Sequence, residues 1–287
     1  MRFILLAAIA LTAPVGAQTL PAALATDPPR DAAHPARLEQ VRYATGGVQV
    51  AARLFVAAGA GIHPTVLLLH GFPGTELNLD LARVLQRAGW NVLAIHYRGV
   101  WGAPGQFSFS HTVEDAHAAI AWLRSPAAAA YGVDPTRIVA LGHSMGGFDT
   151  LMLGDDKALA GYVLISAADM AKSAEADSWT ADKRADFADE ASYTNASVEA
   201  LTADAAAHGA AWNWTERAAQ LAGRPVLVLT SDDGLAPLGE AAARSIVAAG
   251  GPKPTVVHMT TDHSYNDHRV ALAATVAQWL AVHFPSR

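Results

Sequence analysis

Cysteine is absent from the 287 residues, which excludes disulfide bonds, thiol catalysis and thiolate metal sites. Charged residues are scarce as well, at 16%, and 20 Lys and Arg against 26 Asp and Glu leave a formal net charge of −6. Without a basic excess to neutralise phosphates, the chain is not expected to bind nucleic acid. Apolar residues make up 52% of the chain, which excludes disorder for most of it.

The apolar run near the N-terminus is shorter than the ~20 residues that span a bilayer. It covers residues 3–11, follows the positive charge of Arg2, and leads to small residues that end at Ala17. A positive charge, a short apolar run and a small-residue cleavage site are typical of a secretory signal peptide. We therefore expect residues 1–17 to be removed and the protein to be exported, periplasmic or secreted. The length disfavours the alternative of a stable N-terminal membrane anchor.

Strand and helix patterns alternate along most of the chain. A Thr-Gly-Gly turn at residues 45–47 between two apolar segments predicts an antiparallel hairpin. Continuous apolar runs indicate further strands buried on both faces, and helical patterns between them indicate right-handed βαβ units. The predicted fold class is α/β, with a mostly parallel, doubly wound sheet. The predicted strands cover residues 38–44, 48–57, 64–69, 90–96, 137–141, 159–166, 225–230 and 254–259.

The alternation is interrupted once, after the strand that ends near residue 166. Residues 171–223 contain no convincing strand and are rich in alanine and charge, so we interpret them as a helical insertion. Insertions after the carboxyl end of a strand lie over the crevice where α/β sheets bind ligands, so we expect a cap over the site. The predicted organisation is an extended lead-in over residues 18–36 and one core domain made of residues 37–170 and 224–287.

A Gly-x-Ser-x-Gly pentapeptide joins one predicted strand to a helical pattern. It covers residues 142–146 with Ser144 at its centre. A nucleophile must stand clear of its strand on a tight turn, and bulky neighbours would clash with the returning chain. The start of a helix also favours developing negative charge, because its N–H groups are unpaired. Ser144 is therefore the candidate nucleophile, although such a turn can also serve close packing alone.

A serine hydroxyl needs a base to take its proton, and the base needs a neighbouring carboxylate to orient it. The base is expected after the last strand, where residues 261–265 form a polar loop that contains His263. The nearby His268 is expected one turn into the final helix, whose predicted N-cap is Asn266. His263 is therefore the candidate base.

The turn after the strand over residues 225–230 offers two carboxylates, Asp232 and Asp233. Asp233 fits the role of the acid better, because the following turn and Pro237 at the next helix start direct its side chain toward the sheet. Asp232 is the near alternative, and Asp169 before the insertion is a more distant one. Acidic pairs of this kind also occur as plain turn formers.

An acyl-transfer site also needs donors for the oxyanion. One backbone N–H is expected from the residue after the nucleophile and one from the loop after an earlier buried strand. These are the N–H groups of Met145 and Phe72. We expect the neighbouring His70 to make structural hydrogen bonds and His143 to serve packing.

The order Ser144, Asp233, His263 is the nucleophile–acid–base order of the α/β-hydrolases. From His70 to the C-terminus, apart from the insertion, the chain resembles an α/β-hydrolase-fold serine hydrolase. Residues 97–109 also resemble exported esterases and the catalytic domains of prolyl-oligopeptidase-like peptidases. The motifs that carry the main resemblance are His-Gly-Phe-Pro-Gly at residues 70–74, Gly-His-Ser-Met-Gly-Gly at 142–147, Asp233 with Pro237, and Asp262 with His263.

The resemblance implies a serine esterase that cleaves small carboxylic esters through an acyl-enzyme, with no cofactor and no metal. One alternative is an exported serine peptidase of aminopeptidase type, which would need carboxylates to hold a free amino group. The other is a non-catalytic binding protein on the same fold. Candidates for lining the substrate site are Trp101, which can equally cover the sheet edge, and Trp179, Trp212 and Trp214, which core packing explains equally well. Candidates for holding an amine are Glu175, Asp177, Asp186, Asp189 and Glu190, whose spacing is also that of a solvated helix face.

Overall fold

A single eight-stranded sheet organises the chain in the computed structural model, which describes residues 20–285. The predicted signal peptide therefore lies outside the described residues. The strand order across the sheet is β1-β2-β4-β3-β5-β6-β7-β8. The strands are β1 (Arg37–Thr45), β2 (Val48–Val56), β3 (His63–Leu69), β4 (Asn91–Ile95), β5 (Val133–His143), β6 (Gly161–Ile165), β7 (Val226–Thr230) and β8 (Thr255–His258).

The first two strands form the predicted hairpin, with Thr45 opposite Val48. Gly46 and Gly47 make its two-residue turn with φ of 51° and 78°, values that glycine adopts without steric cost. Strand β2 is antiparallel to β4, whereas every pairing from β4 across to β8 is parallel. The prediction of a mostly parallel α/β sheet is confirmed.

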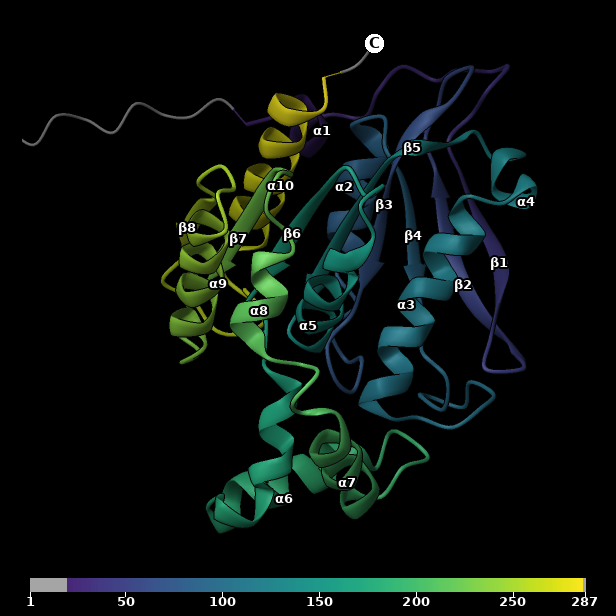
Figure 1. Ribbon diagram of the computed structural model, residues 1–287. Helices are drawn as coiled ribbons and strands as arrows, with labels where there is room; N and C mark the ends of the chain where they lie inside the picture. The colour runs from purple at the N-terminus through teal and green to yellow at the C-terminus, as the bar shows by residue number, and fades with distance from the viewer. Residues whose placement is uncertain (1–19, 286–287) are drawn as a thin grey trace, which may run out of the picture.

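The central strands are buried on both faces, as their continuous apolar runs predict. In β3, Leu67 and Leu69 belong to one hydrophobic cluster, while Val66 and Leu68 belong to the cluster on the other face. Helices cover both faces (Figure 1). Side chains of α2 (Leu79–Arg87) and α10 (Arg269–His283) fill one cluster; α3 (Phe109–Leu123), α5 (Met145–Met152) and α9 (Ala236–Ala248) contribute to the other.

Between β6 and β7 the chain leaves the sheet and forms helices only. They occupy the segment for which the sequence predicts a helical insertion. In Figure 1, α6 and α7 lie together at one end of the sheet, apart from the helices that flank it. The helices of this segment are η2 (Met170–Ser178), α6 (Ala181–Ala191), α7 (Val198–His208) and α8 (Trp214–Ala219).

Three local predictions are wrong. Helix α10 begins at Arg269 with His268 in the N-cap position, so Asn266 is not its cap and His268 is not inside it. The helix starts late because Asn266 donates from its backbone N–H and its amide to the carboxylate of Asp262, which closes a turn first. The lead-in is not wholly extended, since it contains one helical turn, α1 (Ala22–Ala25). Strand β5 begins at Val133, before the predicted residue 137.

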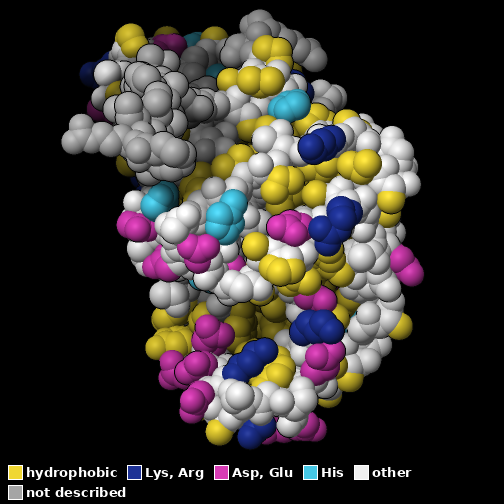
Figure 2. Space-filling view, turned by 90° about the vertical axis from the view of Figure 1, so that its left-hand side faces the viewer, with side chains coloured by type: hydrophobic (Ala, Val, Ile, Leu, Met, Phe, Trp, Pro, Cys, Tyr) yellow, Lys and Arg dark blue, Asp and Glu magenta, His cyan; other side chains and the backbone are white. Residues whose placement is uncertain are grey.

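Two short elements complete the described chain, α4 (Pro126–Ala129) and η1 (Leu153–Asp155). No helix within residues 20–285 has the length and apolarity that a membrane crossing requires. Figure 2 shows acidic and basic side chains interspersed over one face of the molecule, around a hollow whose floor is hydrophobic. That face carries no large area of a single charge sign.

Candidate active site

Ser144 stands on a strained turn between β5 and α5, with φ 56° and ψ −118°. A non-glycine residue tolerates such a backbone only where its surroundings hold it there. A Cβ at Gly142 would overlap the carbonyl oxygen of Gly146, and a Cβ at Gly146 would overlap that of Leu69. A Cβ at Gly147 would lie 2.5 Å from the Ala167 side chain. The glycines around Ser144 are therefore required by backbone packing.

Hydrogen bonds hold this turn at the carboxyl ends of the central strands. The N–H of Ser144 donates to Ile165 at the end of β6, at 2.9 Å. Its carbonyl accepts from Gly147 at 2.9 Å and from Ala168 at 3.0 Å. The Ser144 side chain is partly exposed, while residues on either side of it are buried. Only this hydroxyl of the turn is presented to the outside of the sheet.

His263 pairs with Asp233 and not with Asp232. Asp233 Oδ2 lies 2.7 Å from His263 Nδ1, and the acid is only 5% exposed. Burial by itself would raise the pKa of Asp233, but the hydrogen bond with His263 and the N–H of Leu235 at 2.9 Å outweigh it and hold the pKa well below its ordinary value. The carboxylate is thus ionised and accepts the Nδ1 proton, which leaves Nε2 free to accept another.

A hydroxyl cluster behind Asp233 was not foreseen from the sequence. Ser166 Oγ lies 3.0 Å from Ser231 Oγ and 3.1 Å from the hydroxyl of Tyr265, and all three residues are buried. The two serine hydroxyls also lower the pKa of Asp233. The sequence does contain one indication of this cluster, since Ser166 and Ser231 each directly follow a strand of the sheet.

The alternative acids have other partners. Asp232 lies 3.0 Å from His258 Nε2, and its side chain is 55% exposed. Asp169 accepts from the N–H of Ala171 at 3.1 Å. The alternative base, His268, pairs with Asp267 at 2.9 Å. None of these contacts brings a second acid–base pair to Ser144.

Ser144 and His263 line one cavity, with a volume of about 340 Å³. No hydrogen bond joins the serine hydroxyl to the imidazole within the described residues. Catalytic hydrogen bonds are commonly long in unliganded enzymes and tighten when substrate binds. Ser144, Asp233 and His263 are far apart in the sequence, and the fold brings them to the same end of the sheet.

His143 supports the base through its backbone. Its Nε2–H donates to the carbonyl of His263 at 2.8 Å, and the two rings lie 4.8 Å apart. Burial, together with the charge of His263, lowers the pKa of His143 to about 4, so the ring is neutral and its tautomer is set by that hydrogen bond. The sequence predicts only packing for this residue.

The predicted oxyanion donors lie beside Ser144. A Cβ at Gly71 would come within 3.0 Å of Ser144 Cβ, so the loop carrying Phe72 touches the nucleophile. Among the described residues, no acceptor binds the backbone N–H of Phe72 or Met145. His70 Nδ1 donates to the carbonyl of Gly71 at 2.7 Å, and burial lowers its pKa to about 4. Two unpaired N–H groups beside a nucleophile can hold a developing oxyanion.

Aromatic side chains form one wall of the cavity. The ring of Phe187 on α6 lies 5.6 Å from that of Phe72 and 5.3 Å from that of Trp179. Met170, Leu235 and Leu238 extend the apolar lining. The polar side chains at the cavity, apart from Ser144 and His263, are Asp169, Lys172, Ser173, Lys183 and Glu190.

Only one of the four candidate tryptophans, Trp179, lines this cavity. Trp212 is buried against Phe148, and Trp214 donates its indole N–H to the carbonyl of Leu238. Trp101 lies on the loop after β4, 51% exposed, and does not line the cavity.

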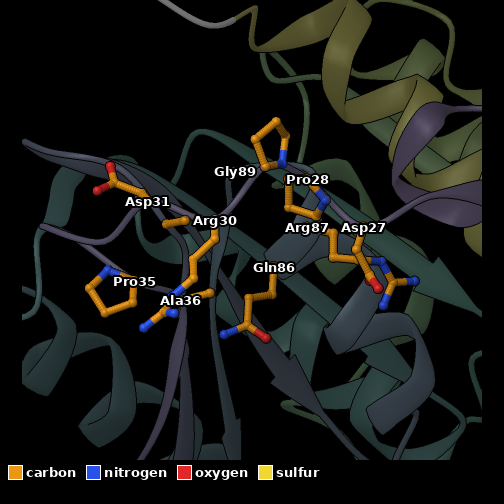
Figure 3. Close-up of a pocket in the computed structure, with 11 residues that line it drawn as sticks. Asp27, Pro28, Arg30, Asp31, Pro35, Ala36, Gln86, Arg87 and Gly89 are labelled. Atoms are coloured by element: carbon orange, nitrogen blue, oxygen red, sulfur yellow. The ribbon is translucent and has the colours of Figure 1, made fainter.

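A second cavity, of about 380 Å³, lies near the amino ends of the parallel strands (Figure 3). Residues 27–31 of the lead-in and Gln86, Arg87 and Gly89 at the end of α2 contribute to its wall. Its lining contains neither a serine nor a histidine, so it does not offer a serine–histidine pair. Among residues 20–285, no group of three or more His, Asp or Glu could hold a metal ion.

Comparison with known proteins agrees with this geometry. Residues 66–276 match the model of the alpha/beta hydrolase family. No curated protein sequence matches the chain. Among solved structures, the chain resembles the thermostable carboxylesterase EstE1 from a metagenomic library, with 24% identity, a TM-score of 0.61, and 86% and 90% of the two chains covered.

Two further solved structures have the same fold. A hyperthermophilic esterase from the archaeon Pyrobaculum calidifontis is 22% identical, with a TM-score of 0.63 and 86% of each chain covered. Brefeldin A esterase, described as a bacterial homologue of human hormone-sensitive lipase, is 20% identical, with a TM-score of 0.57 and 96% and 88% of the two chains covered. At these identities the likeness concerns the fold.

Proposed function

Since this chain belongs to the alpha/beta hydrolase family, we propose that it hydrolyses carboxylic esters through an acyl-enzyme on Ser144. The observation that carries the proposal is the hydrogen bond of His263 with the buried Asp233 at the cavity where Ser144 is exposed. A nucleophile, a base and an acid in these roles suffice for acyl transfer. EstE1 and the Pyrobaculum calidifontis enzyme, which have the same fold, are esterases, and this agrees with the proposal.

In the proposed mechanism, Ser144 Oγ forms a bond to the ester carbonyl carbon while His263 Nε2 takes the hydroxyl proton. Asp233 stabilises the imidazolium that results. The N–H groups of Phe72 and Met145 hold the oxyanion until the C–O bond to the alcohol breaks and the alcohol leaves with the proton. Water then adds to the acyl-enzyme in the same way, which releases the carboxylic acid and restores the serine hydroxyl.

The aromatic wall supports a small ester with an apolar acyl group. Phe72, Trp179 and Phe187 surround space next to Ser144, and burying an apolar group there is favourable by ~25 cal/mol per Å². The volume of about 340 Å³ lies at the low end of the range for small-molecule sites. We therefore propose short or aromatic acyl groups rather than long lipid chains.

A second candidate, cleavage beside a free amino group, is favoured by Glu190. Its carboxylate lines the cavity with Ser144 and His263 and has no ion-pair partner among residues 20–285. The other acids of the insertion that were candidates for this role do not line the cavity. A panel of p-nitrophenyl esters against aminoacyl nitroanilides separates the two functions, and Glu190→Gln would lower turnover of the aminoacyl substrates alone.

The test of the serine mechanism combines a fluorophosphonate probe with ester turnover. The parent protein should be labelled and should hydrolyse p-nitrophenyl esters, because only an activated serine reacts with the probe. Ser144→Ala should lose labelling and on the order of 10⁶ in kcat. A folded Ser144→Ala protein with unchanged turnover would reject the mechanism, and a parent that is neither labelled nor active would favour a binding protein.

We also propose that the protein is exported after cleavage near Ala17. The support is the charged, apolar and small-residue sequence of residues 1–17. Mass spectrometry of the protein from the medium or periplasm of an expressing cell should find an N-terminus at Gln18. An uncleaved chain retained in the cell would contradict this.

A further inference from the structure

Trp101 is an exposed tryptophan on a strained backbone. Its φ is 51°, in the left-handed region that few non-glycine residues occupy, and the residue is 51% exposed. Strain in a loop persists only where surrounding contacts hold it, and it gathers at functional sites. The contacts of Trp101 therefore indicate the function of its strained backbone.

The indole of Trp101 holds the loop that carries a predicted oxyanion donor. Its Nε1–H donates to the carbonyl of Pro73 at 3.0 Å. Pro73 directly follows Phe72, whose N–H faces no acceptor among the described residues. A Cβ at Gly74 would lie 2.7 Å from the His70 ring and 3.3 Å from Trp101 Nε1. The loop at Gly74 is thus in close contact with both the buried imidazole and the indole.

The other side of Trp101 is fixed to the insertion. Its ring packs on the ring of Tyr193 with centroids 4.7 Å apart, and its backbone N–H donates to the Tyr193 carbonyl at 3.0 Å. Val100 and Thr194 form an antiparallel bridge, and Asn195 donates from its N–H to the carbonyl of Gly99 at 2.9 Å. These residues directly follow α6, the helix that supplies Phe187 and Glu190 to the cavity.

We infer that Trp101 is a positioning residue. Its indole is stacked on Tyr193 and binds the carbonyl of Pro73, and this contact fixes the direction in which the Phe72 N–H points for the oxyanion. The inference rests on the proposed esterase function. Trp101 does not line the cavity, so it acts through the loop and not on the substrate. An oxyanion donor acts only when it points at the place where charge develops in the transition state. Loss of the indole N–H should therefore slow the chemical step and leave ground-state binding intact.

The test is Trp101→Phe, which removes the N–H and keeps a ring to stack on Tyr193. We expect kcat for a p-nitrophenyl ester, per fluorophosphonate-titrated site, to fall about tenfold to hundredfold, with KM within about twofold of the parent. The affinity for a trifluoromethyl ketone, whose serine adduct carries an oxyanion, should fall by the same factor. A merely structural role would lower the melting temperature and leave both readouts unchanged.

The control is Trp122→Phe. Trp122 lies in α3 and packs on Tyr131, away from the loop over residues 70–74. The kcat and the inhibitor affinity of this variant should therefore stay at parent values. Tyr193→Leu is a second test variant, because it removes the ring on which the indole stacks and keeps the indole N–H. We expect kcat and inhibitor affinity each to fall by about two- to fivefold. Should Trp101→Phe not fold, Tyr193→Leu decides.

The inference is overturned if Trp101→Phe, or Tyr193→Leu in its place, keeps parent values of kcat and inhibitor affinity in an active enzyme. That result would leave the proposed function standing. A parent without labelling or ester turnover would overturn the proposed function, and this inference with it.

Discussion

Asp232 and Asp233 are adjacent in sequence and differ in environment. Asp233 is buried and accepts from His263 and from the N–H of Leu235, and the hydroxyls of Ser166 and Ser231 lower its pKa further. Asp232 is more than half exposed and pairs with His258. Because Asp232 contacts His258 and only Asp233 contacts His263, Asp233 is the acid placed to orient the candidate base.

Asp233→Asn should lower kcat for ester hydrolysis by about 10³–10⁴, since the amide no longer favours the tautomer with a proton on Nδ1 of His263. Asp232→Asn serves as the matched control and should stay within about threefold of the parent, because its pair is exposed. Steady-state kinetics on both variants check the prediction. A larger loss in the Asp232 variant would show that the catalytic acid is misassigned.

At the scale of elements, the strand–turn–helix unit around Ser144 depends on close backbone contact. Gly146 lies where a methyl group would overlap the Leu69 carbonyl and come within 2.8 Å of that of His70. Helix α5 therefore packs directly on the end of β3, which brings Met145 and the loop after β3 together. The proposed oxyanion donors owe their proximity to this contact.

Gly146→Ala should lower the free energy of unfolding by about 1–3 kcal/mol, as overpacking does, and should also lower kcat by displacing Met145. Gly209→Ala is the control, since its Cβ would meet one backbone oxygen at 3.1 Å at the exposed end of α7. Urea unfolding and ester turnover measure the two effects. Equal stability of both variants would contradict tight packing at the turn.

Helix α6 places Phe187 at the cavity that Ser144 and His263 line. The side chain is 8% exposed and contacts Phe72 and Trp179. Removing an apolar group of this size forfeits about 1.5–3 kcal/mol of burial. Phe187 therefore shapes the part of the cavity that we propose for the acyl group.

Phe187→Ala should lower kcat/KM for p-nitrophenyl acetate and butyrate by about tenfold or more, and shift the optimum to longer acyl chains that refill the space. A series of p-nitrophenyl esters from two to twelve carbons, about the range that such a cavity discriminates, checks this. Trp122→Phe, remote from the cavity, serves as the control. An unchanged chain-length profile would place the acyl group elsewhere.

At the scale of the whole molecule, one buried carboxyl makes stability depend on pH. Asp149 on α5 accepts from Tyr97 at 2.6 Å and from Thr112 at 2.8 Å. Burial raises its pKa to about 7 against the opposing effect of these two hydrogen bonds. In the unfolded chain the pKa of an aspartate is about 3.9. Between the two values the folded state holds a proton that the unfolded state has lost.

The contribution of Asp149 to stability is therefore fully present below about pH 4 and is lost as pH rises toward 7, by about 4 kcal/mol in all. Asp149→Asn cannot titrate, so the parent should lose stability relative to this variant between pH 5 and about pH 8. Urea unfolding of both proteins across this range gives the difference. Parallel stability curves would contradict the raised pKa.

The sequence by itself determined what depends on local pattern. Apolar runs and helical periodicity predict the sheet, its parallel strands and the helices between them, and glycines around Ser144 predict the turn after β5. The order of serine, acid and histidine follows from the same reading, since each comes at the end of a predicted strand. These features are encoded within a few residues of chain.

Only the tertiary structure decided which side chains meet. It pairs His263 with Asp233, places Ser166, Ser231 and Tyr265 behind that acid, and brings His143 to the carbonyl of His263. It also buries Trp212 and Trp214 and joins Trp101 to Pro73. The physical reason is that such contacts depend on how separate strand ends and loops are brought side by side, and periodicity along the chain does not contain that information.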